Sequence, residues 1–179
     1  MLYPIKDYEG LYSIDIIKMC VWSHTSNKYL KNIIAGGNNS YQVRLYKNGI
    51  GKTYKIHRLL YCAYNNCEIP TGLWIDHINN NSLDNRSDNL RLATISENNV
   101  NRLISRNNTT GYKNVSYDKN HKSYRVQITS NGNTHISFHK DLIHAVNTAD
   151  RVRLLFHKNF TNNGIGSTTT HIINDLEEE

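Results

Sequence analysis

The chain has 179 residues, a hydrophobic fraction of 38% and a formal net charge of +6 at pH 7. This length suits one compact domain or a few small ones, and the positive charge favours a polyanionic partner such as nucleic acid. No run of residues approaches the ~18 apolar residues of a membrane span, and the first ten residues lack the apolar segment of a signal peptide. With three cysteines but no CxxC pair, these features predict an intracellular protein without a membrane partner.

Residues 1–55 are predicted to form a β-rich segment. Three β-rich runs, at residues 12–17, 42–46 and 53–57, are separated by stretches rich in Gly and Asn, which are typical turn residues. The basic residues of this segment have two interpretations, DNA contacts or an ordinary solvated surface. They are Lys28, Lys31, Arg44, Lys47, Lys52 and Lys55.

The middle of the chain is predicted to have the order helix, strand, loop, strand, helix. Residues 57–65 place apolar side chains on one face of a helix, and residues 73–78 form a short apolar strand. A polar loop and a second short strand follow. Thr94 and Glu97 match the S/T-x-x-E capping box, so a helix is expected from Ile95 to Ile104.

Polar residues at the end of the strand 73–78 suggest hydrolysis of a phosphodiester bond. His77 is suited to act as a general base on water, and Asp76 is suited to bind a divalent metal at the phosphate. Asn89 is placed to hydrogen-bond the imidazole of His77 and fix its tautomer. Asn98 falls in the first turn of the following helix, whose N-terminus favours phosphate. Taken singly, each of these residues is better explained as a turn, cap or surface residue.

Taken jointly, the stretch HRLLYCAY…GLWIDHINNNSLDNRSDNLRLATISENN resembles the HNH motif in its H-N-N form, as found in phage and intron-encoded homing endonucleases. The resemblance implies a ββα-metal core of the His-Me finger type. It implies that His77 is the general base, that Asn89 orients it, and that Asp76 and Asn98 bind one Mg²⁺ or Mn²⁺ ion. An asparagine in the third position disfavours a zinc-dependent variant. His57, at the start of the stretch, is expected to be structural.

Residues after the motif are predicted to form a second, smaller α+β unit. Strands are expected at residues 113–117, 123–129 and 134–138, with a hairpin turn at Asn131-Gly132. A helix is expected after Asp141, which is a good N-cap, because apolar residues then recur at i, i+3 and i+4 spacing.

The outer face of this predicted sheet is expected to contact DNA. Strand alternation turns Val126 and Ile128 toward the helix and their neighbours outward, and Arg and Gln are the side chains best suited to guanine and adenine edges. Ten basic and three acidic residues lie between residues 99 and 160, an excess of +7. The residues expected on the outer face are Arg125, Gln127, Thr129, His135 and Ser137.

This C-terminal region is similar to the three-stranded DNA-binding domain of plant ethylene-response factors, which homing endonucleases also carry. The similarity rests on Gly111-Tyr112-Lys113, Tyr124-x-Val126-x-Ile128, residues 145–150 of the helix and residues 156–160. The usual strand Trp is absent, and the usual Leu-Gly-x-Phe before the helix is shortened here to Phe138-His139-Lys140. Sequence specificity is therefore not transferable from that family.

The sequence thus predicts a modular α+β protein. Its segments are a β-rich region at 1–55, an HNH nuclease core at 56–105, a DNA-binding domain of three antiparallel strands plus a helix at 106–162, and a disordered tail at 163–179. The expected activity is site-specific but sequence-tolerant cleavage of double-stranded DNA with one Mg²⁺ or Mn²⁺ ion, by a homing endonuclease acting as a monomer or a dimer. The alternatives are a non-specific nuclease and a DNA-binding protein with an inactive HNH fold. Besides the outer-face residues, the residues expected to bind DNA are Arg58, Arg91, Arg102, Arg106, Lys113, Lys119 and Lys122.

Overall fold

A computed structural model describes residues 1–34, 39–130 and 132–157 of the chain. The chain forms two compact units, Met1–Ile95 and Ser96–Glu179, called here the first and the second unit. The predicted tail at 163–179, and the last residues of the predicted segment 106–162, lie outside the described residues. Within the described ranges, no helix combines the length and the apolar character needed to cross a bilayer.

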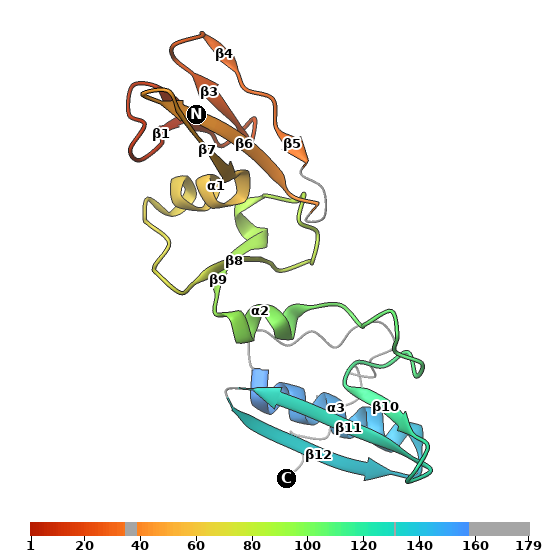
Figure 1. The fold of residues 1–179 in the computed structure, drawn as a ribbon. Coiled ribbons are helices and arrows are strands. Elements are labelled where there is room, and N and C mark those ends of the chain that lie inside the picture. Colours follow the sequence, from red (N-terminus) through yellow and green to blue (C-terminus); the bar gives the residue numbers. More distant parts are fainter. Residues whose placement is uncertain (35–38, 131, 158–179) are drawn as a thin grey trace. The chain divides into compact units, whose positions relative to one another are not determined.

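The first unit begins with two small antiparallel sheets (Figure 1). The first sheet contains β1 (Leu2–Pro4), β2 (Tyr12–Asp15), β3 (Cys20–Ser23) and β4 (Lys28–Tyr29) in chain order. The second contains β5 (Ile33–Ile34), β6 (Tyr41–Lys47) and β7 (Ile50–Lys55). Strands β2 and β6 confirm predicted runs, and β7 confirms the first three residues of the run 53–57, whose last two residues begin α1 instead. Strands β1, β3, β4 and β5 were not predicted. Asn48 and Gly49 both have positive φ, 52° and 79°, as a type I′ turn between β6 and β7 requires.

Helix α1 (Ile56–Asn65) joins these sheets to the hairpin that follows. Ile56 and Leu60 are fully buried and pack with Ile14, Val43 and Leu45 in one hydrophobic core. The helix also contacts β8, β9 and the 3₁₀ turn η1 (Ser87–Asn89). The predicted helix is therefore confirmed, and it is the element that fixes the hairpin against the N-terminal sheets.

Strands β8 (Trp74–His77) and β9 (Leu90–Ala93) form a two-stranded antiparallel hairpin. In its register, Asp76 lies opposite Arg91 and His77 opposite Leu90. The long loop between the strands is held by its own asparagines: the backbone N–H of Asn81 donates to Asn79 Oδ1 at 2.8 Å, and that of Leu83 donates to Asn81 Oδ1 at 3.1 Å.

The second unit contains α2 (Ile95–Asn101) and an antiparallel sheet of β10 (Val115–Asp118), β11 (Ser123–Ser130) and β12 (Asn133–His139), followed by α3 (Leu142–His157). Helix α2 starts at the predicted residue and ends three residues before the predicted Ile104.

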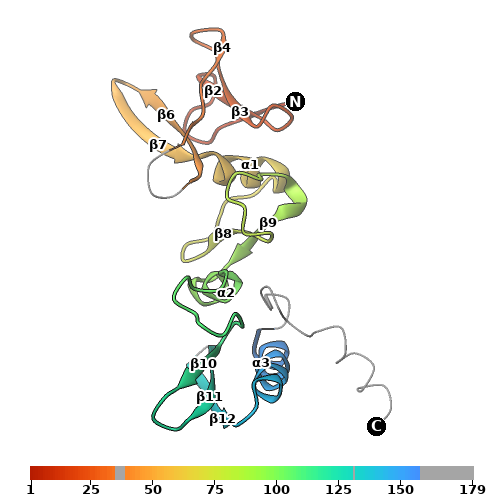
Figure 2. The same cartoon turned by 90° about the vertical axis from the view of Figure 1, so that its right-hand side faces the viewer.

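Helix α3 lies along one side of this sheet (Figure 2). Val126 and Ile128 are fully buried against Ala145, Val146 and Ala149, as strand alternation predicted. The N–H of His144 donates to Asp141 Oδ1 at 3.0 Å, which confirms Asp141 as the N-cap.

Candidate active site

The two residues at the end of β8 are both buried. Asp76 is 5% exposed and His77 is 8% exposed. Neighbouring residues of a strand point to opposite faces, and accordingly the two side chains have different surroundings. Asp76 Oδ2 accepts a hydrogen bond from Arg91 Nε at 2.9 Å across the hairpin. The two side chains form an ion pair in which Asp76 is buried and Arg91 is half-buried.

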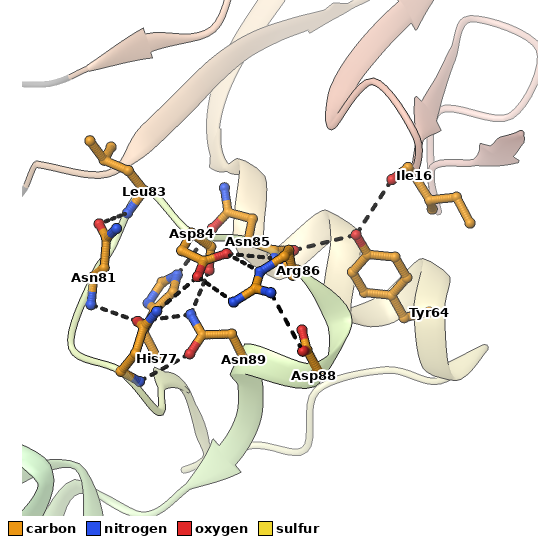
Figure 3. Close-up of polar contacts among 11 residues, drawn as sticks. Ile16, Tyr64, His77, Asn81, Leu83, Asp84, Asn85, Arg86, Asp88 and Asn89 are labelled. Carbon is orange, nitrogen blue, oxygen red and sulfur yellow. Dashed lines mark hydrogen bonds and ion pairs between the residues drawn. The ribbon is translucent and has the colours of Figure 1, made fainter.

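The imidazole of His77 is held in the interior by residues from two other elements. Its Nε2 lies 3.0 Å from Oδ1 of Asn85, which comes from the loop between β8 and η1 (Figure 3). Its ring also meets the ring of His57, from the first turn of α1, with centroids 5.0 Å apart and an interplanar angle of 87°. This edge-to-face contact and the hydrogen bond restrict the ring on two sides.

His57 is a buried and neutral histidine. It is 7% exposed, and its Nδ1 has no hydrogen-bond partner among the described residues. Burial lowers the pKa of His57 to about 3, and repulsion from the charges of His77, Lys55 and Arg58 adds to the effect. The structure gives His57 a structural role of a definite kind, because its ring packs against the ring of His77, the predicted general base.

Asn89 binds the ends of the loop that surrounds His77. Its Oδ1 accepts from the backbone N–H of Asn79 at 3.0 Å, and its Nδ2 donates to Asn79 Oδ1 at 3.0 Å and to the carbonyl of Asp84 at 2.7 Å. Its own carbonyl accepts from the N–H of Ile78 at 3.0 Å. These contacts brace the backbone on both sides of the loop.

Asp84 and Arg86 complete this network and were missed by the sequence analysis. Arg86 donates to both carboxylate oxygens of Asp84, at 2.9 and 3.0 Å (Figure 3). Asn79 Nδ2 donates to Asp84 Oδ2 at 2.8 Å. The hydrogen bond from Arg86 is the main reason why the pKa of Asp84 falls to about 2. Asn85 was missed as well, because one asparagine in a loop of many carries no distinguishing local signal.

Asn98 lies on α2, in the second unit, and its side chain is half-buried. Its predicted partner in a metal site, Asp76, lies in the first unit, so their common site stays a prediction. Among the described residues, no three His, Cys, Asp or Glu side chains gather in one group. A carboxylate and an amide oxygen are the ligand types that would suit Mg²⁺ or Mn²⁺ rather than zinc, which prefers nitrogen and sulfur.

The sheet face opposite α3 differs in part from the predicted one. Arg125, Gln127 and Thr129 point away from the helix side, but His135 and Ser137 do not, since they pair with the buried Ile128 and Val126. Their prediction as outer-face residues was wrong. Ser130 pairs with Asn133, so each odd-numbered residue of β11 lies opposite an even-numbered residue of β12. A hairpin turn placed at 131–132 in the sequence already implied this register. The outer-face residues of β12 are Thr134, Ile136 and Phe138.

Lys113 is not a surface cation. Its ammonium donates to the carbonyls of Val100 and Arg102, at 2.5 and 2.7 Å, and so binds carbonyls at the end of α2. Burial lowers the pKa of Lys113 to about 8, with repulsion by Arg153 as a second cause. The predicted DNA contact of Lys113 is therefore corrected to a structural contact.

The other predicted DNA-binding residues remain open to ligands to different degrees. Arg58 and Arg91 are half-buried, and Arg58 lines a cavity of about 550 Å³ together with Lys6 and Lys52. Of the predicted DNA-binding cations in the second unit, Arg102, Arg106, Lys119 and Lys122 are exposed.

In this mixed α+β fold, strand β8 ends in a histidine and a carboxylate, the side-chain types that metal-assisted phosphodiester hydrolysis uses. The sequence profile of the family described as HNH endonuclease matches residues 54–100. The chain is 38% identical to Protein 3.8 of Escherichia phage T7 over 95 residues. The matched stretch covers 53% of this chain and 78% of that protein. The chain belongs to the HNH endonuclease family. Members of this family generally use a divalent metal ion.

Two further relatives are similar over about half of their length. They are the uncharacterized HNH endonuclease L560 of Acanthamoeba polyphaga mimivirus, 32% identical over 54% of this chain and 52% of that protein, and the DNA endonuclease I-HmuI of Bacillus phage SP01, 40% identical over 50% of each. A solved structure concerned with DNA binding and cleavage by the HNH homing endonuclease I-HmuI is similar to this fold, with a TM-score of 0.51 and 27% identity over 85% of this chain and 82% of that chain.

Proposed function

We propose that the protein is a metal-dependent endonuclease that cleaves double-stranded DNA at a sequence-tolerant site, as a homing endonuclease does. The observation that carries this proposal is the buried His77 at the end of β8, held by Asn85 and His57 beside the carboxylate of Asp76. The likeness to I-HmuI, a DNA endonuclease by name, supports the choice of substrate. We assign β8, β9 and α2 to a ββα-metal core of the His-Me finger type.

In the proposed reaction, His77 removes a proton from a water molecule while the water oxygen forms a bond to phosphorus and the bond to the 3′ oxygen breaks. Asp76 and Asn98 are the residues proposed to bind the ion, Mg²⁺ or Mn²⁺. A bound divalent ion supplies stabilisation of the negative charge on the phosphate and on the leaving oxygen. Asn89 contributes by bracing the loop around His77. Arg91, which pairs with Asp76, keeps that carboxylate in place.

The remaining parts of the chain are proposed to bind DNA. We keep the division into a β-rich region at 1–55, the nuclease core at 56–105 and a DNA-binding domain at 106–162, similar to that of ethylene-response factors. Arg125 supports this, because it lies on the sheet face that points away from α3, beside the exposed Gln127 and Thr129. The protein is proposed to act as a monomer. The residues proposed to contact DNA are Arg58, Arg91, Arg102, Arg106, Lys119, Lys122, Arg125, Gln127 and Thr129.

Substitution of the general base tests the proposal. His77→Ala should reduce Mg²⁺-dependent cleavage of plasmid DNA by at least about 10²–10⁴-fold, the usual contribution of a general base, while DNA affinity measured without metal stays unchanged. Ser137→Ala, on the helix side of the sheet in the second unit, is the control. Cleavage at the wild-type rate by the variant would remove His77 from the mechanism.

The two alternative functions give different results in the same assay. A non-specific nuclease would produce scattered ends on every DNA, whereas the proposed enzyme produces ends at one position. An inactive DNA-binding protein would bind the DNA and leave it intact both with Mg²⁺ and with EDTA. Mapping the ends on DNA from the locus that encodes the protein therefore separates all three.

A further inference from the structure

Asn85 is the most deeply buried polar group next to the proposed general base, and the mechanism above assigns it no chemical task. Asn85 is only 2% exposed to solvent. Its Oδ1 lies 3.0 Å from Nε2 of His77, and both partners of this contact are buried (Figure 3). A buried hydrogen bond of this kind is costly to lose.

The chemistry of this contact defines the protonation of the ring. An amide oxygen only accepts hydrogen bonds, so Nε2 of His77 must be the nitrogen that carries the hydrogen. In a neutral imidazole the lone pair then resides on Nδ1. A histidine acts as a general base only through the nitrogen with the lone pair. The hydrogen bond to Asn85 therefore selects which nitrogen is basic.

Contacts on both sides place Asn85 at this distance from the ring. The carbonyl of the preceding residue, Asp84, accepts a hydrogen bond from Asn89 Nδ2 at 2.7 Å. The carbonyl of Asn85 itself accepts from the hydroxyl of Tyr64, on α1, at 3.3 Å. Asn89 thus acts on the loop that carries Asn85, and α1 fixes the same loop from the other side.

We propose that Asn85 is a positioning residue for the general base: its side-chain oxygen keeps the hydrogen of His77 on Nε2 and directs the lone pair of Nδ1 to the attacking water. This inference rests on the proposed function, in which His77 is the base. It differs from the expectation that Asn89 itself orients the ring, because the observed side-chain acceptor at Nε2 belongs to Asn85.

A spectroscopic experiment without DNA tests the tautomer directly. Long-range ¹H–¹⁵N spectra of the protein with ¹⁵N-labelled histidines, recorded with EDTA at a pH where His77 is neutral, report which ring nitrogen carries the hydrogen. The His77 signal is assigned by its loss in His77→Ala. We expect the Nε2–H form alone, with a slowly exchanging ring proton. An Nδ1–H form, or a mixture of both forms, would overturn the inference.

Two substitutions of Asn85 test its effect on catalysis. Asn85→Leu removes the acceptor while keeping the branching of the side chain, and should lower kcat about tenfold to a hundredfold, with little change in KM for DNA. Asn85→Asp keeps an acceptor at the same place and should restore most of the wild-type kcat. Asn120→Ala changes an exposed asparagine outside this loop and is the matched control. Equal losses in the Leu and Asp variants would contradict a positioning role.

The outcomes also separate this inference from the proposed function. If His77→Ala cleaves like the wild type, the proposed mechanism fails even where the tautomer is the expected one. If His77→Ala is inactive but the wild-type ring shows mixed tautomers, only the task of Asn85 is wrong. Should Asn85→Leu fail to fold in thermal denaturation, the wild-type spectrum and the isosteric Asn85→Asp variant still decide the question.

Discussion

At the scale of single residues, the two histidines that pack against each other have opposite requirements. A general base must gain a proton during the reaction, and a second positive charge 5.0 Å away would oppose that gain. His57 avoids this conflict, because burial holds its pKa at about 3 and the ring stays neutral near pH 7. It therefore offers His77 an aromatic surface without a charge.

The pKa of His57 leads to a prediction about stability. Because this pKa is about 3 in the folded protein, against a reference of 6.5, the unfolded chain binds the proton first. The contribution of His57 to stability is complete above about pH 6.5, and as the pH falls toward 3 it decreases by up to about 1.4 kcal/mol per pH unit. His57→Phe should lack this decrease. Urea denaturation near pH 7 and near pH 5 measures the free energy of unfolding of the wild type and of His57→Phe. An equal loss of stability in both proteins between the two pH values would contradict the burial of a neutral His57.

At the scale of elements, the hairpin of β11 and β12 shows how register assigns side chains to faces. Arg125 lies opposite Phe138, and Gln127 opposite Ile136, so the outer face combines polar and apolar side chains. Ile136 and Phe138 are each 47% exposed there. Such a face suits a DNA groove, where apolar side chains contact the methyl group of thymine and polar ones contact base edges.

Substitutions on this face should reduce the specificity of DNA binding and not only its affinity. Arg125→Ala combined with Gln127→Ala should weaken binding to the cleavage site more than binding to random DNA, by about 1–3 kcal/mol for each base that the variant no longer recognises. Fluorescence anisotropy at one fixed salt concentration measures both affinities. His135→Ala, on the helix side, is the control. Equal weakening on both DNAs would mean that the face contacts only phosphates.

At the scale of the whole molecule, the chain contains one proposed active site, built around His77. A monomer with one such site cuts one strand per binding event. Supercoiled plasmid that carries the target should therefore become open circular, with no linear form appearing first. Agarose electrophoresis over time measures this at several protein concentrations. Direct formation of linear DNA, with a rate that rises with the square of the protein concentration, would instead show a dimer.

The amino-acid sequence by itself determined the order of the main elements from α1 to α3 and the residues that end β8. Apolar periodicity, the Asp141 cap and the turn residues act over a few positions, and for that reason α1, the hairpin, and the three strands with α3 were predicted correctly. The family resemblance directed attention to Asp76 and His77, which are both buried at the end of β8.

Only the tertiary structure decided which distant groups meet. It placed His57 against His77, chose Asn85 from a loop rich in asparagine, and turned the ammonium of Lys113 to the end of α2. It also moved His135 and Ser137 to the helix side. Local pattern cannot specify these contacts, because they depend on strand register and on how α1 packs against the loop, which are set by burial over the whole unit rather than by neighbouring residues.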